Sequence, residues 1–417
     1  MDSDIEKAIV KPSRFVALTY RDFRLFWFGQ FTSNVGTQML LVAVNWHIYL
    51  LTHSPVALGL IGFMRFLPIV LFSLIGGSFA DTHNRKKVII VCQIIFAILS
   101  ATLALTTFSH KINPIIIYLV TVVQAATLSF DMPSRQALVP SLVDKKHLAN
   151  AMSINAILFQ TGMILGPSIA GVLIARFGVG TIYAIDAVSY VAVICGMLLI
   201  HTSGDVEGKT SEFSFSAILE GLHYVRSKTI IWSTMLLDFF STFFSSATAL
   251  LPIFAKDILQ VGPQELGLLY AAPSIGAVLA GFAMAHAGTI KKQGKVLLVA
   301  VGFYAVGTII FGLSKQFLLS LIALIIVGAG DAVSMIIRNT IRQLSTPDYI
   351  RGRMSSVNMI FFMGGPQLGE FEAGLLAALF TAPASVVIGG IATLFVVAIV
   401  GAKINTLRNY ESHLEHS

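Results

Sequence analysis

The chain has 417 residues, of which 55% are hydrophobic and only 12% are charged. Soluble domains carry about 25% charged residues, so this composition excludes an ordinary water-soluble protein and predicts a chain whose solvent is lipid. Its two cysteines exclude a disulfide framework and a cysteine metal cluster, and its formal net charge is +7.

Apolar runs of the right length recur along the whole chain. A bilayer core about 30 Å thick needs about 20 apolar residues as a helix. Such runs predict twelve spanning helices, near residues 25–51, 57–80, 88–108, 114–133, 149–175, 181–201, 230–254, 266–287, 296–314, 317–338, 355–379 and 384–402. The longest polar stretch divides the chain into a six-helix half (1–201), a cytoplasmic linker (202–229) and a second half with a short tail (230–417).

The basic residues predict how the chain is inserted. Of the 28 lysines and arginines, 23 fall in the N-terminal segment, the linker, the tail and the loops on the same side as these segments. Cytoplasmic loops carry such an excess, so we expect both termini in the cytoplasm. The positive charge is then a topology signal, and nucleic acid is not an expected partner.

Polar side chains follow one face of the first predicted helix. Gln30, Asn34, Gln38 and Asn45 are spaced by four, four and seven residues, so they share a face. A polar stripe in an apolar helix favours a water-filled cavity, and Gln124 on the fourth helix is expected to join it.

The loop after the second helix carries a recognisable string. Gly77, Asp81, Arg85 and Lys86 have the spacing of the signature between helices two and three of the major facilitator superfamily, which this chain resembles. The resemblance implies an all-α membrane protein of twelve helices in two pseudo-symmetric six-helix bundles. It also implies that Asp81 meets the N-terminal end of helix eleven, where a helix dipole favours a carboxylate.

The fifth helix carries a strip of small residues with a proline. Gly162, Gly166, Pro167 and Gly171 are similar to the antiporter signature of that superfamily, with Ala170 in place of one glycine. Small residues let a second helix approach closely, and proline removes a backbone hydrogen bond. The strip favours antiport or export over uptake, although ordinary helix packing also explains it.

Further strings narrow the resemblance to the branch that contains the enterobactin exporter and macrolide efflux proteins. They are 133–137, 140–143, 186–190 and 351–354. The resemblance implies a proton-coupled exporter of a large amphipathic molecule such as a siderophore or drug. It also implies a bacterial inner membrane, alternating access and a monomer.

The two halves show a faint repeat. Gly166-Pro167 aligns with Gly365-Pro366 about 200 residues later, and each pair follows a basic loop. Inverted or repeated halves commonly build a substrate site near the midplane that opens to either side in turn.

Two charges inside spans predict a gate. Arg65 on the second helix and Glu370 on the eleventh lie at a similar depth, about 12 to 14 Å from the non-cytoplasmic edge at ~1.5 Å per residue. Such charges are expensive in lipid, so we expect an ion pair that closes the outer side and opens on protonation. A purely structural pair is the alternative. Glu372 lies about 200° around the helix from Glu370 and so cannot face the same partner.

The seventh helix offers a second acidic candidate. Asp238 is expected to bind a proton or a cationic substrate group, and Phe240 and Phe244 are expected to line a cavity for a large apolar ligand. The alternative places these rings against lipid and hydrogen-bonds the aspartate within the bundle.

Other function classes lack their motifs. The sequence has no phosphate-binding loop, no His-Glu-x-x-His and no Gly-x-Ser-x-Gly, so we expect neither an enzyme nor a cofactor. The nearest competing functions are an importer or facilitator of a small nutrient and, more remotely, a membrane enzyme that transports nothing.

Overall fold

The computed structural model describes residues 15–205, 215–288 and 290–411, and these contain helices but no strand. The first half comprises α1 (Arg21–Thr52), α2 (Pro55–Thr82), α3 (Arg85–Phe108), α4 (Pro114–Leu138), α5 (Leu148–Phe177) and α6 (Val179–Leu199). The second comprises α8 (Thr229–Phe244), α9 (Leu251–Ile253), α10 (Pro263–His286), α11 (Gln293–Leu313), α12 (Phe317–Leu344), α13 (Asp348–Leu379) and α14 (Ala382–Lys403), followed by α15 (Asn405–Arg408).

Sharp helix starts keep the connecting loops short. Ser54 accepts a hydrogen bond from the backbone of Ala57, and Pro55 follows it at the first helical position, where its missing N–H is not needed. Asn113 and Pro114 start α4 in the same way. Asp144 lies in the loop before α5 and accepts a 2.7 Å hydrogen bond from the hydroxyl of Tyr20, which precedes α1. This hydrogen bond lowers the pKa of the Asp144 carboxyl.

Twelve helices form the membrane-spanning set, as the sequence predicts. Eleven helical segments of the described chain are long and apolar enough to cross a bilayer. The twelfth, α13, has the same 32-residue length as α1 and packs against α2, α8 and α14, but its polar residues, Glu370 and Glu372 among them, lower its hydropathy. Spanning helices that carry charges in this way face the protein interior or a cavity rather than lipid.

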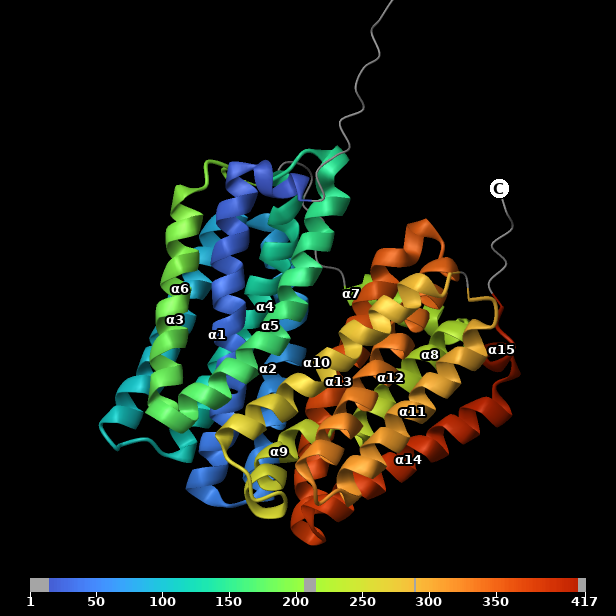
Figure 1. Cartoon of the computed structure of the whole chain (residues 1–417). Coiled ribbons are helices and arrows are strands. Elements are labelled where there is room, and N and C mark those ends of the chain that lie inside the picture. The colour runs from blue at the N-terminus through green and yellow to red at the C-terminus, as the bar shows by residue number, and fades with distance from the viewer. Residues whose placement is uncertain (1–14, 206–214, 289, 412–417) are drawn as a thin grey trace, which may run out of the picture.

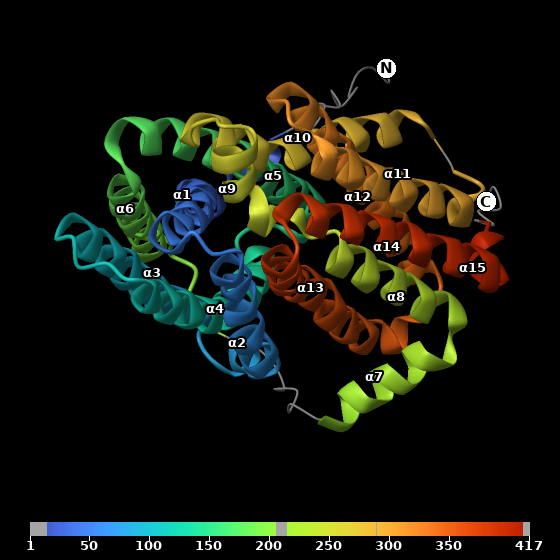
Figure 2. The ribbon, with the colours of Figure 1, turned by 90° about the horizontal axis from the view of Figure 1, so that it is seen from below.

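The helices form two six-helix bundles that lean together at one end. In Figure 1 the bundles meet near α9, α10 and the lower part of α2, and they diverge toward the side where α1 begins. Contact between the bundles runs mainly through two helix pairs, α2 with α13 and α5 with α10. Seen from below, in Figure 2, α2 lies beside α13 and α5 beside α10.

Each of these two pairs crosses at facing glycines. A Cβ added at Gly59 would lie 3.0 Å from the Cα of Gly374, and one added at Gly267 would lie 3.0 Å from the Cα of Gly171. Only glycine permits backbones to approach this closely. Gly171 therefore corresponds to Gly374, so the sequence alignment on the Gly-Pro pairs is wrong by one helical turn, although the same helix face is involved.

The predicted helix 230–254 is broken. After α8 the chain passes through a 3₁₀ turn (Ala247–Leu250), the short α9 and a π-helical turn (Phe254–Ile258). Hydroxyls stabilise the break: Ser245 bonds Thr393 at 2.7 Å, and Ser246 donates to the carbonyl of Pro366 at 3.2 Å. Hydropathy alone cannot predict this, because backbone freed inside a bundle is tolerated wherever neighbouring side chains satisfy it.

The polar linker contains an amphipathic helix that the sequence analysis does not anticipate. This helix, α7 (Phe215–Ser227), packs on α13, where Gly221 meets the backbone of Arg353. Glu220 pairs with Arg353, and the Tyr224 hydroxyl donates to the carbonyl of Ser345. The linker therefore joins the second bundle through specific contacts.

Candidate substrate cavity and gate

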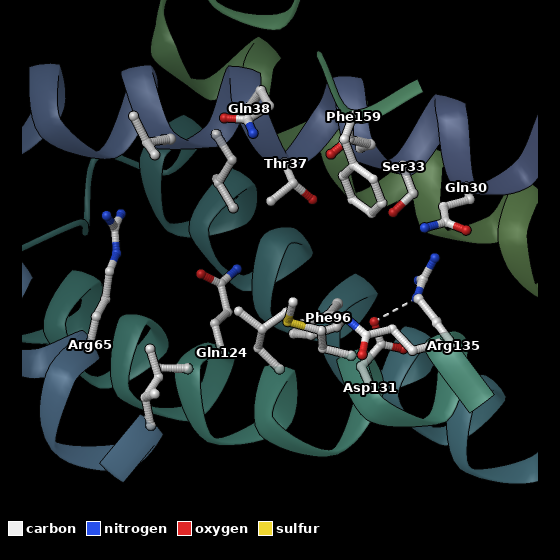
Figure 3. A pocket seen from close by; sticks show the side chains of 18 of the residues that line it. Gln30, Ser33, Thr37, Gln38, Arg65, Phe96, Gln124, Asp131, Arg135 and Phe159 are labelled. Atoms are coloured by element: carbon white, nitrogen blue, oxygen red, sulfur yellow. Dashed lines mark hydrogen bonds and ion pairs between the residues drawn. The ribbon is translucent and has the colours of Figure 1, made fainter. Parts of the chain in front are cut away.

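A cavity of ≈ 720 Å³ lies between the bundles and is walled almost entirely by the first one. Of its lining residues only Met363 and Gln367 belong to the second half. Its polar wall includes seven carboxamides, two arginines and one carboxylate: Gln30, Asn34, Gln38, Gln124, Gln136, Asn155, Gln367, Arg65, Arg135 and Asp131. Figure 3 shows side chains from α1 and α4 facing one another across this space.

The cavity extends toward the side of the described chain ends. Its wall includes Gln30 near the start of α1, Val139 after α4 and Met152 near the start of α5, which all lie on that side. Toward the opposite side the glycine crossings bring the bundles into contact. The structure is thus closed on one side and hollow toward the other.

The polar stripe of α1 divides between this wall and the closed end. Gln30, Asn34 and Gln38 line the cavity, and Gln124 joins them from α4. Asn45 does not line it: this side chain is buried beside Tyr270 of α10, where the halves meet. The part these residues play in substrate binding stays a prediction.

The two arginines of the wall have different surroundings. Arg135 pairs with Asp131 one turn earlier at 2.6 Å, and Gln93 donates to the other oxygen of Asp131 at 3.0 Å. Arg65 extends from α2 toward α1 across the cavity (Figure 3). Among the described residues, no carboxylate oxygen lies within 4.0 Å of the Arg65 guanidinium, the distance limit for an ion pair.

Glu370 lies at the contact between the halves. A Cβ on Gly62 of α2 would lie 2.7 Å from the Cβ of Glu370 and 3.0 Å from its Oε2, and Thr248 donates to its Oε1 at 3.4 Å. The direct Arg65–Glu370 ion pair expected from the sequence is absent among the described residues, because the guanidinium lines the cavity instead.

The second carboxylate of α13 is set apart from the first. Glu372 is partly buried, and among the described residues it forms neither an ion pair nor a side-chain hydrogen bond. The angular separation expected from the sequence agrees with Glu370 alone reaching Gly62.

Asp238 belongs to a buried ionic network. Arg338 reaches one of its oxygens at 2.7 Å and Arg342 the other at 3.3 Å, while Arg338 also lies 3.6 Å from Asp331. The predicted helix 317–338 ends at Arg338 and leaves Arg342 in a cytoplasmic loop, but α12 continues to Leu344 and buries both. Asp238 is accordingly absent from the cavity wall, and its expected contact with a cationic substrate is not supported.

The predicted aromatic lining is also absent from this cavity. Phe240 and Phe244 stack on each other with ring centroids 6.1 Å apart, and neither lines the cavity described above. Phe240 is partly exposed on the bundle surface. Helical spacing cannot separate a cavity face from a lipid face, since phenylalanine suits both.

The small-residue strip of α5 serves two neighbours. Gly162 and Gly166 face Asn34 and Gln38 of α1, within the same half. One turn on, Gly267 of α10 packs on Pro167 and Gly171. The strip thus contacts the second half only at its C-terminal end, and at its N-terminal end it packs against two cavity carboxamides of α1.

The loop signature holds the ends of the first bundle together. Arg85 donates to the carbonyl of Ala137 at 3.1 Å and Lys86 to that of Ile200 at 2.6 Å. Asp81 is exposed and has no ion pair within the described chain, and nothing lies within 4 Å of a Cβ added at Gly77. Its expected contact with the start of helix eleven is therefore not formed in this conformation.

A hydrogen bond between Tyr49 and Asp257 on the closed side, here called the clasp, was not predicted from the sequence. The Tyr49 hydroxyl of α1 donates to the carboxylate of Asp257 in the π-helical turn, and the Lys256 ammonium lies 5.9 Å from the Tyr49 ring centroid. Tyr49 and Asp257 belong to different halves, so only the register between the halves reveals that they meet. The signal that the sequence offered was the pair of charges Lys256 and Asp257, between the predicted helices 230–254 and 266–287.

Comparison with known proteins places this chain in a family of transporters. The model of the family described as transmembrane secretion effector (MFS_3) matches residues 12–417. The chain belongs to this family. It is 26% identical over 394 residues to the enterobactin exporter EntS of Citrobacter koseri and to that of Salmonella typhimurium, covering 94% of this chain and 94% of each relative.

Solved structures agree on the fold. The nucleoside transporter NupG superposes with a TM-score of 0.73 at 14% identity, covering 92% of this chain and 99% of that one. A bacterial homolog of the lysosomal transporter Spinster, in an inward-facing and occupied conformation, gives 0.71 at 16% identity, covering 94% and 97%. The chain is a multi-pass membrane transporter of the major facilitator fold, not an enzyme.

Proposed function

We propose that this transporter exports an amphipathic small molecule from the bacterial cytoplasm in exchange for protons, by alternating access. The observation that carries the proposal is a cavity closed on one side, with a carboxylate, Glu370, at the closing contact. A cavity between two bundles that lean together at one end suits a site exposed to each side in turn.

The direction in which the cavity opens rests on the basic residues. The cavity extends toward the chain ends, and the excess of lysine and arginine lies on that side. Under the positive-inside rule the termini are cytoplasmic, so the cavity opens on the cytoplasmic side of the inner membrane. A substrate made in the cell would enter from there.

Glu370 is the residue proposed to carry the proton. Its carboxylate is enclosed between α2 and α13, which must separate when the outer side opens. Opening would hydrate this carboxylate on the proton-rich side, and closing would bury it again. A charge in a span is costly, so its protonation and the closing of the two helices are linked.

The comparisons support export of a siderophore or drug. The family is described as a secretion effector, and the relatives are named enterobactin exporters. The carboxamides, arginines and aromatic side chains of the wall suit a large molecule with polar groups on an apolar frame.

The test uses purified protein in liposomes that contain a pH-sensitive dye. Under an imposed proton gradient, enterobactin is added as the first candidate substrate and a macrolide as the second. We expect substrate to move against protons, with the exchange lost in Glu370→Gln. Movement at an unchanged rate after a protonophore collapses the gradient would overturn antiport, and substrate moving together with protons would establish an importer.

A further inference from the structure

The charged groups of the cavity wall are unbalanced toward the positive. Its lining includes Arg65 and Arg135 but, among the described lining residues, one carboxylate, Asp131. Asp131 is already held by Arg135 and by Gln93. Arg65 is left in the wall with no carboxylate in ion-pair range among the described residues.

The carboxamides add hydrogen-bond donors to this positive wall. The side-chain oxygens of Gln30, Asn155 and Gln367 are buried and, in the described structure, have no hydrogen-bond partner. Each of these carboxamides can donate hydrogen bonds through its nitrogen and accept them through its oxygen. Gln30 and Asn155 are more than nine-tenths buried, so these groups are fixed parts of the wall rather than mobile surface side chains. Beside the positive charge of Arg65, the N–H groups of these carboxamides provide donors for the acceptor oxygens of an anionic ligand.

In the second bundle the counterpart of Arg135 is neutralised by a different acid: Arg338 follows Arg135 by 203 positions, the spacing between the starts of α4 and α12. Gln30 and Asp238 are 208 positions apart, the same spacing as the helix-initial prolines Pro55 and Pro263. In the second half Asp238 binds Arg338 directly. The first half has a neutral glutamine at that position, so the wall lacks a second acid.

Aromatic side chains complete the wall. Phe96 and Tyr190 stack with centroids 5.4 Å apart, and Phe159 lies opposite α4 in Figure 3. Such rings favour flat, conjugated ligands. The volume of ≈ 720 Å³ accommodates a drug-sized molecule.

We propose that the cavity binds an anionic aromatic molecule rich in acceptor oxygens, and that Arg65 is the anchor for its negative group. This proposal rests on the proposed function, since it takes the cavity to be the substrate site. It deepens that function by assigning the charge of the substrate. It also gives Arg65 two alternating electrostatic partners: the ligand in the cavity and Glu370 at the gate.

The test compares two dyes of similar xanthene frame and opposite charge. Fluorescein (anionic) and rhodamine 123 (cationic) are titrated with purified protein in detergent, and binding is followed by fluorescence anisotropy against empty micelles. We expect the wild type to prefer fluorescein. Arg65→Gln should weaken fluorescein binding about ten-fold, the loss of one charge-assisted hydrogen-bonded contact. Arg65→Lys should restore part of it, and Arg176→Gln, which changes an exposed arginine outside the wall, should have no effect.

A gain of binding separates the proposal from misfolding. Gln30→Asp supplies the acid that the second half has at the corresponding position. We expect it to weaken fluorescein binding and to strengthen rhodamine 123 binding, a change that an unfolded protein cannot produce. Preference of the wild type for rhodamine 123, absence of fluorescein binding, or equal fluorescein binding by Arg65→Gln would each overturn the anion site. Because the assay uses no membrane and no gradient, these outcomes are independent of whether antiport is observed in liposomes.

Discussion

The two bundles use arginines at corresponding places in opposite ways. In the second, Arg338 and Arg342 are 2% and 3% exposed and are held by Asp238, with Asp331 nearby. In the first, Arg135 is 12% exposed and lines the cavity beside its own Asp131. One arginine cluster is sealed within a bundle, and the other belongs to the surface that a substrate would meet.

This difference assigns unequal tasks to two similar folds. The first bundle supplies nearly all of the cavity wall, while the second supplies Glu370 at the closing contact. Pseudo-symmetry therefore extends to the glycine crossings that join the halves but not to the chemistry. Substrate recognition and proton binding are placed on opposite sides of one moving interface, which is a simple way to couple them.

The largest expected effect tests the sealed cluster. Asp238→Asn should destabilise the protein by about 3–5 kcal/mol, because two buried arginines lose their common counter-ion. Asp131→Asn should cost less, since Arg135 can be solvated through the cavity. Thermal unfolding in detergent measures both variants. An equal or larger loss for Asp131→Asn would remove the distinction between the two clusters.

The two carboxylates of α13 offer a matched pair for proton coupling. Glu370→Gln should reduce substrate-dependent proton exchange at least about ten-fold, equivalent to about 1.4 kcal/mol. Glu372→Gln should leave it nearly unchanged, because Glu370 packs on Gly62 of the opposite half whereas Glu372 lies elsewhere on the helix. Dye-loaded liposomes report the exchange. Equal losses in the two variants would show that proton exchange depends on the acidic residues of α13 in general, and not on the contact of Glu370 with Gly62.

The glycine crossings test how tightly the closed side is held. An added methyl at Gly267 would press on Pro167 and Gly171, so Gly267→Ala should disfavour this conformation by about 1–3 kcal/mol. Asn45→Cys, in a background without Cys92 and Cys195, reports opening through its labelling by a water-soluble maleimide, because this position is buried where the halves meet. Labelling should speed up about ten-fold. Gly77→Ala is the control, since a methyl there meets open space, and a matching increase in that variant would contradict the assignment.

Much of this architecture could be predicted from the sequence, for a physical reason. Hydropathy reports the solvent of a segment directly, so eleven spans of the described chain are recognisable by length and apolar composition. The twelfth, α13, coincides with the run predicted at 355–379 although its polar residues lower its hydropathy. The face shared by Gln30, Asn34 and Gln38 follows from helical periodicity in the same way. These features depend on local sequence alone.

Features that depend on the register between helices were not predictable. The predicted helix 317–338 ends too early, because basic residues are interpreted as marking its cytoplasmic end. Arg338 and Arg342 are instead buried within α12. For Phe240 and Phe244 the sequence leaves a cavity face and a lipid face open, since both accept the same ring, and neither residue lines this cavity. The break after α8 depends on hydroxyl partners from other helices, such as Thr393.

The smallest expected effect concerns the clasp between Tyr49 and Asp257. Tyr49→Phe removes the hydrogen bond that joins α1 to the π-helical turn of the other half, while keeping the ring that packs there. A hydrogen bond to a charged group contributes about 1.5–3 kcal/mol when buried, but this one lies near the water-exposed end, where about 1 kcal/mol is expected. The closed side should open about five-fold more often, which the labelling rate of Asn45→Cys measures. Tyr118→Phe is the matched control, because its hydroxyl donates to Ala57 within the first half and so does not span the moving interface. If both variants raised labelling equally, the clasp would have no special part in closing the outer side, and the glycine crossings would hold it alone.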